Sequence, residues 1–146
     1  MNRKEFIRTC GFACLSGSTL LALLESCAST YYYAKTIYNN NKIIISKSEF
    51  IENVKNRKIK RKHVFVKHDK YNFPICVFKL NEEIYTALLM ECTHKGCELI
   101  AQGDFLVCPC HGSEFTNHGQ VLNPPAEQNL KSFKTIVDTD NIYLYV

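Results

Sequence analysis

C-T-H-K-G-C at residues 92–97 and C-P-C-H-G-S at residues 108–113 are the stretches that decide the fold and the chemistry of this sequence. The first contains a Cys-x-His pair and the second a Cys-x-x-His pair. Two loops that each give one thiolate and one imidazole can hold a flat [2Fe–2S] cluster from two sides, with both thiolates on one iron and both imidazoles on the other. The candidate metal ligands are Cys92, His94, Cys108 and His111.

These motifs resemble those of the Rieske [2Fe–2S] family, and specifically of its disulfide-containing branch. The resemblance extends over about residues 60–146. It implies one cluster per chain, with Cys92 and Cys108 on the inner iron and His94 and His111 on the outer iron. Because two neutral imidazoles replace two thiolates, we expect a potential of roughly −150 to +300 mV, against about −400 mV for plant-type ferredoxins with four cysteines.

Zinc is the alternative that the ligand types leave open, because zinc also takes sets of two sulfurs and two nitrogens. Two further cysteines, Cys97 and Cys110, occupy matching places in the two loops, and a zinc site leaves them without a role. The family resemblance implies that these two cysteines form a disulfide that clamps the loops. A stable disulfide in turn indicates an oxidising compartment.

Three residues near the ligands set expectations for the potential and the partner. Ser113 looks like the family's serine that donates a hydroxyl hydrogen bond to a bridging sulfide, which raises the potential. Phe115 stands where high-potential members carry a tyrosine, so we expect a potential below that of tyrosine-bearing relatives. Lys95 stands where quinol-oxidising relatives usually place a leucine, and it adds a cation to the docking surface.

Backbone geometry around the cluster gives two further expectations. Gly96 and Gly112 stand where the backbone passes close to the cluster, and we expect a Cβ to obstruct that approach. The sequence N-P-P-A at 123–126 is similar to the proline-containing loop that covers the cluster in relatives, where a stiff turn excludes water. A surface turn without contact to the cluster is the alternative.

Length and charge restrict the class of protein. With 146 residues and 46% hydrophobic content, the chain suits one globular domain. A net charge of +4 does not indicate a nucleic-acid partner. The one dense basic run spans residues 55–62 and consists of Lys55, Arg57, Lys58, Lys60, Arg61 and Lys62. We expect a solvated turn there, with contact to anionic lipid or to an acidic partner as the alternative.

The amino terminus has the features of an export signal. Residues 3–8 (R-K-E-F-I-R) look like a twin-arginine signal with lysine in the second place, and a mildly apolar stretch follows over 12–24. The sequence L-E-S-C at 24–27 is similar to a bacterial lipobox, in which Cys27 would be acylated. A retained signal that acts as an anchor stays open, although polar residues at 16–19 make a full membrane span a poor fit. Each version places the domain outside the cytoplasm, in the periplasm or at the exterior of a bacterium, beside a membrane.

From residue 42 onward the pattern predicts an all-β fold. Apolar, β-branched or aromatic runs bounded by turn residues predict strands at Ile43–Ile45, Val64–Val66, Phe73–Leu80, Ile84–Met90, Leu99–Ala101, Phe105–Val107, Leu130–Val137 and Ile142–Val146. Helical spacing occurs only over Ser48–Lys55. The strands fit an antiparallel β-sandwich with a small inserted cluster-binding subdomain, which is also the fold that the resemblance implies.

We therefore divide the chain into a signal or anchor at 1–27, a tether at 28–41 and a Rieske domain at 42–146, with the cluster part at about 90–126. The tether is polar and rich in tyrosine, and its run Tyr31–Tyr33 suits a membrane interface. A partly ordered linker or a first edge strand is the alternative for this segment.

Four other cysteine or histidine residues are expected to have no role at the cluster. We expect Cys76 to be a small buried hydrophobic residue. We expect His63, His68 and His118 to face the solvent.

The resemblance implies a one-electron carrier, most simply the iron–sulfur subunit of a membrane quinol-oxidising complex of the cytochrome bc or b6f type. The alternative is the small Rieske subunit of a periplasmic oxidase of the arsenite oxidase type. A zinc-binding lipoprotein is a third class. Expected partners are membrane-bound redox proteins, and the membrane surface is reached through the amino terminus.

Overall fold

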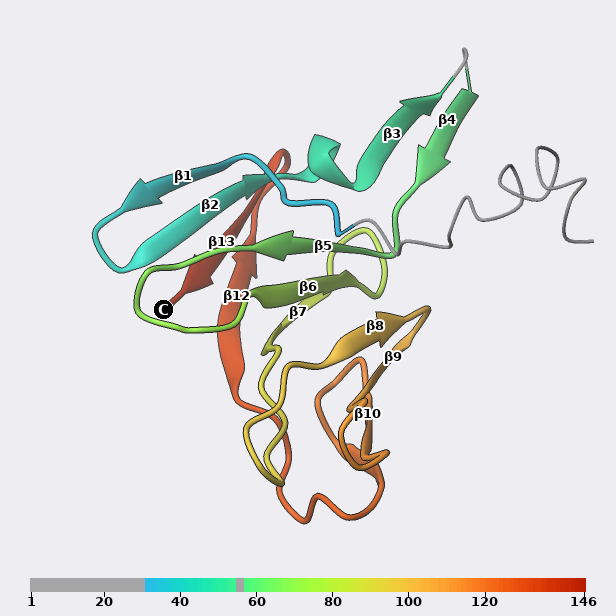
Figure 1. Cartoon of the computed structure of the whole chain (residues 1–146). Coiled ribbons are helices and arrows are strands. Elements are labelled where there is room, and N and C mark those ends of the chain that lie inside the picture. Colours follow the sequence, from blue (N-terminus) through green and yellow to red (C-terminus); the bar gives the residue numbers. More distant parts are fainter. Residues whose placement is uncertain (1–30, 55–56) are drawn as a thin grey trace, which may run out of the picture. The chain divides into compact units, whose positions relative to one another are not determined.

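Thirteen strands and one short 3-10 helix form the part of the chain that this computed structural model describes, residues 31–54 and 57–146. Seven strands form one antiparallel sheet in the order β1-β2-β13-β12-β7-β6-β5 (Figure 1). Their bounds are β1 Thr36–Asn39, β2 Lys42–Ser46, β5 His63–Val66, β6 Ile75–Lys79, β7 Tyr85–Leu89, β12 Ser132–Val137 and β13 Asn141–Tyr145.

The two edges of this sheet meet through the segment that precedes β1. Tyr33 and Phe65 form a parallel bridge, with hydrogen bonds from the Ala34 N–H to the Phe65 carbonyl and from the Phe65 N–H to the Tyr32 carbonyl. Side chains that alternate along the strands point inward from both halves of the sheet. They form a first core whose buried members include Ile43, Ile45, Val64, Val66, Ile75, Val77, Ala87, Phe133, Ile142 and Leu144.

The inserted subdomain, which we expected to bind the cluster, lies in the chain between β7 and β12 (Figure 1). It is a four-stranded sheet in the order β11-β10-β9-β8, with bounds β8 Ile100–Gln102, β9 Phe105–Val107, β10 Glu114–Thr116 and β11 Val121–Asn123. A second core joins it to the other face of β5, β6 and β7. This core contains Phe65, Cys76, Phe78, Leu88, Met90, Leu99, Leu106, Phe115, Ala126 and Leu130, together with Cys92 and Cys108.

This architecture confirms the predicted all-β antiparallel fold with an inserted subdomain. Every strand that the sequence predicted from residue 42 onward is present, with ends within two residues of the expected ones. Cys76 is fully buried, as expected. From residue 42 onward the prediction missed four strands, of which β10 and β11 have three residues each.

The expected helix over Ser48–Lys55 is wrong. Only Lys47–Phe50 is helical, as a 3-10 turn, and β3 (Ile51–Val54) then pairs with β4 (Arg57–Lys60) in a separate two-stranded sheet. Phe50 is buried in the first core, and its carbonyl accepts a hydrogen bond from the Arg61 N–H. Because the chain is held at both residues, the basic segment returns as a hairpin, whose Arg57–Lys60 strand is exposed.

Two of the three histidines expected at the surface are partly buried. The His63 ring packs against Phe65 and Phe78 with centroids 5.3 and 5.4 Å apart, and its Nδ1 is buried without a hydrogen-bond partner among the described residues. His68 is half-buried beside Tyr71, while His118 is exposed as expected.

The structure describes residues 31–41 of the predicted tether. They include β1, which pairs with β2 as the edge-strand alternative has it. The predicted signal, the lipobox and Cys27 lie outside the described residues. Among the described residues, no helix has the length and apolar character that crossing a membrane requires.

Candidate metal centre

The two motif loops have the same backbone hydrogen bonds. In the first loop, the Cys92 N–H donates to the Cys97 carbonyl and the Gly96 N–H donates to the Cys92 carbonyl, both at 2.8 Å. In the second, the Cys108 N–H donates to the Ser113 carbonyl at 2.8 Å, and a glycine N–H four residues after Cys108 donates back to it at 2.9 Å. Each loop is therefore a closed turn that begins at a cysteine and presents a histidine.

The glycines of these turns have a conformational requirement of their own. Gly96 and Gly112 have φ angles of +70° and +79°, a region that L side chains rarely adopt. No protein atom lies within 4 Å of a Cβ at Gly112, and the nearest at Gly96 is a Glu91 oxygen at 3.6 Å. The described structure thus requires glycine for its left-handed turn and not for a close approach of protein atoms.

Both motif thiols lie inside the second core. Cys92 is 2% and Cys108 is 1% exposed, and neither takes part in a disulfide. Burial raises the pKa of the Cys92 thiol, while the backbone N–H groups of His94 and Lys95 act in the opposite direction. A buried thiolate needs a nearby positive charge, and a bound metal ion supplies it.

Both motif imidazoles lie nearer the surface. The rings of His94 and His111 meet edge to face with centroids 4.8 Å apart, and His111 is exposed. The Nδ1 of His94 is buried without a hydrogen-bond partner among the described residues. A buried imidazole nitrogen of this kind is costly unless it is paired, and coordination to a metal would pair it.

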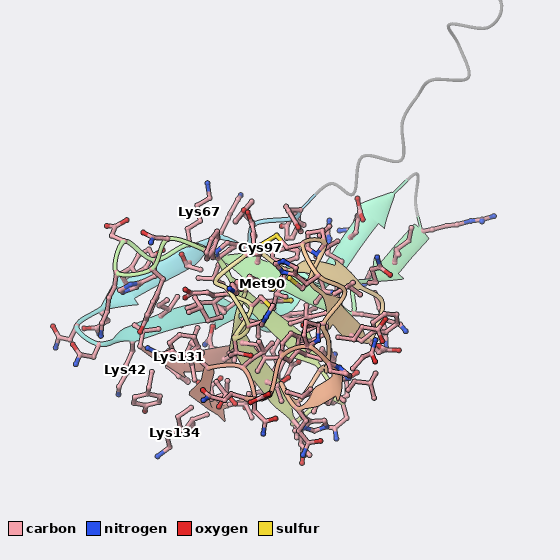
Figure 2. The ribbon with its side chains drawn as sticks, turned by 60° about the horizontal axis from the view of Figure 1, so that its bottom comes forward. Lys42, Lys67, Met90, Cys97, Lys131 and Lys134 are labelled. Carbon is pink, nitrogen blue, oxygen red and sulfur yellow. A yellow bond between two sulfur atoms is a disulfide. The ribbon has the colours of Figure 1, made fainter. Side chains whose placement is uncertain are left out.

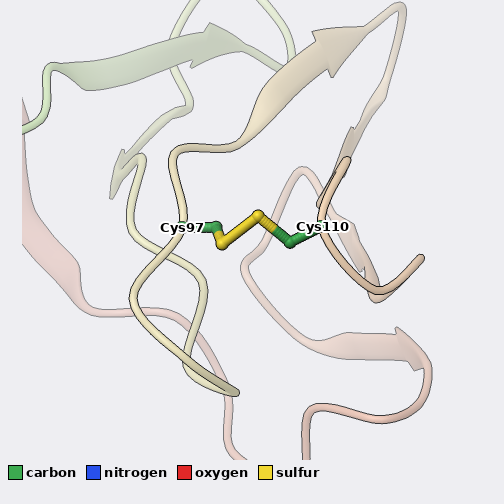
Figure 3. The surroundings of a disulfide bond; sticks show 2 residues. All are labelled: Cys97 and Cys110. Atoms are coloured by element: carbon green, nitrogen blue, oxygen red, sulfur yellow. A yellow bond between two sulfur atoms is a disulfide. The ribbon is translucent and has the colours of Figure 1, made fainter.

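A disulfide joins the two loops (Figure 3). It links Cys97 and Cys110, as the family resemblance implied. The sulfurs of Cys97, Cys108 and Cys110 lie within 4.8 Å of one another, which places the disulfide directly beside a candidate ligand. Disulfide sulfurs are not thiolates, so Cys108 is the sulfur of this group that is available to bind a metal.

Ser113 connects the second loop to the proline-containing loop. Its side chain is fully buried, and its Oγ accepts a hydrogen bond of 3.0 Å from the Ala126 N–H. The hydroxyl hydrogen remains available for donation toward the metal site. Phe115 is 0% exposed in the same core as both thiols and offers no hydrogen-bond donor.

A second hydrogen bond, from the first loop, holds the segment after the prolines. The Thr93 hydroxyl donates to the Gln128 carbonyl at 2.6 Å. Segment 126–128 is therefore hydrogen-bonded to both ligand loops. Sequence reasoning missed Thr93 and Ala126 because their partners are 35 and 13 positions away and one partner in each pair is a backbone group.

The arrangement fits a [2Fe–2S] cluster. The fold brings together two buried thiols, two adjacent imidazoles with one inward-facing unpaired nitrogen, and a buried hydroxyl with a free hydrogen. Two loops supply these groups from two sides, as a flat cluster requires.

Comparison with known proteins supports this interpretation. The family model of the Rieske [2Fe–2S] domain matches residues 47–134 of the chain. Among solved structures, the plasma membrane Rieske protein PetC3 from Synechocystis PCC 6803 is similar, with 32% sequence identity and a TM-score of 0.52. The match covers 58% of this chain and 87% of that one.

Curated relatives include iron–sulfur subunits of the cytochrome b6-f complex. The subunit from Synechococcus sp. (strain JA-3-3Ab) is 40% identical over 53 residues, which are 35% of this chain and 31% of that protein. The subunit from Chlorobaculum tepidum is 32% identical over 63 residues, which are 42% of this chain and 35% of that protein. The matched part thus spans about a third of the length of these relatives.

Proposed function

Since the chain belongs to the Rieske [2Fe–2S] family, we propose that it transfers electrons one at a time as the iron–sulfur subunit of a membrane quinol-oxidising complex of the cytochrome bc or b6f type. Its cofactor is a Rieske [2Fe–2S] cluster. The cluster supplies a one-electron redox centre with a potential of roughly −150 to +300 mV. We assign its ligands to Cys92, His94, Cys108 and His111, and a hydrogen bond to it from the Ser113 hydroxyl.

One observation carries the proposal: the thiols are buried while the imidazoles reach the surface. Cys92 and Cys108 are at most 2% exposed, whereas His111 is exposed and His94 is half-buried. The histidine side is therefore where the ligands of the site are accessible to a partner. Electron transfer to and from the site would use this face.

The same geometry supports proton exchange at the histidines. With the Nδ1 of His94 facing inward, its Nε2 is the nitrogen left to meet a partner. A deprotonated Nε2 can accept the proton of a quinol hydroxyl and can hold the quinol by the same hydrogen bond. The exposed His111 offers a second such nitrogen.

The relatives favour this complex over the oxidase alternative. The curated relatives described above are subunits of cytochrome b6-f complexes.

Lys95 is exposed on the first loop between the two motif positions His94 and Gly96, so it adds a positive charge to the docking face. We expect the partner surface that receives this face to be neutral or acidic there.

We further propose that the amino-terminal segment holds the domain at a membrane outside the cytoplasm. The basic start, the apolar stretch over 12–24 and the lipobox-like L-E-S-C at 24–27 support an exported chain that is acylated at Cys27 or retained by its signal. The disulfide supports an oxidising compartment. The part of the tether that remains outside the described structure, 28–30, would connect the anchor to the domain.

The test is purification of the full chain in mild detergent from the membranes of its native host. We expect the purified fraction that contains the chain to show a b-type haem spectrum. We also expect added quinol to reduce the cluster, so that the EPR signal of a reduced Rieske cluster becomes detectable. A molybdenum-containing partner, with no reduction by quinol, would overturn the quinol role in favour of the oxidase alternative.

A further inference from the structure

Four strands of the seven-stranded sheet present a row of apolar side chains on their outer face. Ile37 of β1 pairs with Ile44 of β2, Ile44 pairs with Tyr143 of β13, and Tyr143 pairs with Ile136 of β12. Residues directly opposite in antiparallel strands point to the same face, so these four side chains stand side by side. Ile37 is 67% and Ile136 is 43% exposed.

A row of lysines borders the apolar row on the same face. Lys134 of β12 pairs with Tyr145 of β13, and Tyr145 pairs with Lys42 of β2. The two ammonium groups lie 5.8 and 5.0 Å from the centroid of the tyrosine ring. In Figure 2 these lysines lie together, away from Cys97 at the metal centre. We call the apolar row and this Lys134–Tyr145–Lys42 row together the lysine face.

The strand residues of the lysine face have charge of one sign. The outward positions of β1, β2, β12 and β13 contain no acidic residue. The β12–β13 turn contains Asp138 and Asp140, and the Asp138 carboxylate accepts a hydrogen bond of 2.6 Å from the Tyr143 hydroxyl. An anionic surface would therefore meet two cations and an apolar row, with one carboxylate at the Tyr143 end.

We propose that the lysine face rests on an anionic membrane surface, an inference that depends on the proposed membrane anchoring of the amino terminus. Isoleucine side chains enter the boundary between headgroups and acyl chains, tyrosine rings lie at headgroup level, and each lysine near an anionic bilayer is attracted to it. This composition matches the two rows of the face.

The length of the chain supports the same occupant. Ile37 follows Cys27, the proposed acylation site, by ten residues. Ten residues span at most about 33–36 Å when fully extended, so anchoring keeps β1 within that distance of the bilayer. A second copy of the chain suits the face less well, because pairing two such faces would oppose lysine to lysine.

The experiment uses the absence of tryptophan from the chain. Ile37→Trp places the single tryptophan on the lysine face, and Ile84→Trp is the matched control in the β6–β7 turn, where Ile84 is 53% exposed. Each full-length variant is reconstituted into vesicles of phosphatidylcholine and phosphatidylglycerol, with and without bromine on the acyl chains. The readout is the ratio of tryptophan emission without bromine to that with bromine.

We expect the brominated lipid to quench the tryptophan of Ile37→Trp strongly and that of Ile84→Trp weakly. The double variant Lys42→Gln with Lys134→Gln should lower the equilibrium constant for contact between the lysine face and the vesicle surface by about thirtyfold. Each lysine near an anionic surface contributes about 1 kcal/mol to this contact. High salt should also weaken the contact and reduce the quenching of Ile37→Trp, because it screens the attraction between the lysines and the anionic lipid.

Three results would overturn the proposal. Equal quenching of the two tryptophans, quenching that is unchanged in vesicles of phosphatidylcholine alone, or weak quenching of Ile37→Trp that rises when the protein is diluted at constant lipid would each exclude the anionic membrane as the occupant. The last result would indicate that a second copy of the chain covers the face. A chain that fails to float with the vesicles would overturn the anchoring and the lysine face together, whereas a missing Rieske EPR signal would concern only the cluster.

Discussion

Phe115 and Ser113 are two buried side chains beside the site, and they differ in their ability to donate a hydrogen bond to a sulfur. Both are fully buried, Ser113 with a hydroxyl whose oxygen is taken by the Ala126 N–H, and Phe115 with no polar atom on its side chain. Hydrogen bonds to cluster sulfurs stabilise the reduced, more negative state, and so they raise the potential. The absence of a hydroxyl at Phe115 predicts a potential in the lower part of what this ligand set allows.

Phe115→Tyr should raise the midpoint potential of the cluster. A new hydrogen bond to the Cys92 sulfur that favours the reduced state by about 1 kcal/mol corresponds to roughly 40 mV for one electron. Redox titration of the purified variant measures this shift. Phe105→Tyr, at a half-exposed ring in β9, is the control and should leave the potential unchanged. A folded Phe115→Tyr protein with an unaltered potential would contradict this reason for a low potential.

At the level of single residues, the sequence predicted more of the metal centre than of its support. The four candidate ligands and both disulfide cysteines stand in motifs whose spacing is visible in one loop at a time. The hydrogen bonds of Thr93 and Ser113 to the segment after the prolines join a side chain to a backbone group far along the chain. Backbone groups have no sequence signal, so such contacts could not be predicted.

The two ligand loops act as one element because the disulfide and the second core hold them together. Each loop is a short closed turn, and the loops follow different strands, β7 and β9. Only tertiary contacts can therefore fix their relative position. The Cys97–Cys110 bond, with a sequence separation of 13, is the covalent part of that connection.

Replacing both disulfide cysteines, in Cys97→Ser with Cys110→Ser, should lower the free energy of unfolding by about 3 kcal/mol and reduce the iron content per chain. Urea titration and iron analysis measure the two effects. Cys76→Ala removes a buried thiol outside the disulfide and serves as the control for cysteine loss. Full iron content and an unchanged urea midpoint in the double variant would show that the disulfide does not hold the loops.

Gly119 fixes how the cluster-binding subdomain packs on the seven-stranded sheet. Its φ is +81°, and a Cβ there would lie 2.8 Å from the Cδ2 of Leu88 in β7. Gly119→Ala should therefore cost about 1–2 kcal/mol for the left-handed backbone and about 1–3 kcal/mol more for overpacking. Gly103→Ala is the matched control, because Gly103 has a φ of +63° with no atom within 4 Å of its Cβ. Equal losses of stability in the two variants would exclude the contact with Leu88 as a cause.

Strands were predictable from the sequence where they lie in an apolar run. β6 and β7 lie in such runs. Of the four strands with three residues, β8 and β9 were predicted because they lie in the apolar runs Leu99–Ala101 and Phe105–Val107, whereas β10 (Glu-Phe-Thr) and β11 (Val-Leu-Asn) include polar residues and form no such run. The β3–β4 hairpin depends on Phe50 and Arg61 being held by the main body, which is tertiary context.

The molecule as a whole consists of two cores on opposite faces of β5, β6 and β7. The first core consists of inward-facing side chains from the strands of the seven-stranded sheet. The second core joins that sheet to the cluster-binding subdomain. The bridge between Tyr33 and Phe65 brings the segment before β1 to the far edge of the sheet. The sequence could not predict this closure, because the three tyrosines at 31–33 are compatible both with a tether and with a segment at the edge of a sheet.

His63 makes the stability of the molecule sensitive to acid. Burial lowers the pKa of this histidine from 6.5, against smaller opposite effects of the Gly103 backbone and the Asp104 carboxylate. Below pH 6.5 the unfolded chain takes up a proton that the folded chain resists. The contribution of neutral His63 to the free energy of unfolding is therefore complete above pH 6.5. This contribution is lost as the pH decreases from 6.5 to the lower pKa of the folded state.

His63→Gln should remove this part of the acid sensitivity. Urea titrations of the wild-type and variant proteins across the mildly acidic range measure it as the slope of stability against pH. His118→Gln is the control, because His118 is exposed and should leave the slope unchanged. Equal slopes for wild-type and His63→Gln proteins would show that another group causes the loss.

The most direct test of the metal centre is an EPR-monitored redox titration of the full chain at several pH values. We expect the signal of a reduced Rieske cluster and a midpoint potential that falls at alkaline pH, because electron uptake by the cluster would be coupled to proton uptake at its histidine ligands. A protein with stoichiometric zinc and no iron–sulfur signal would contradict the assignment of Cys92, His94, Cys108 and His111. A cluster whose potential is the same at every pH would contradict the role of the histidines in proton exchange.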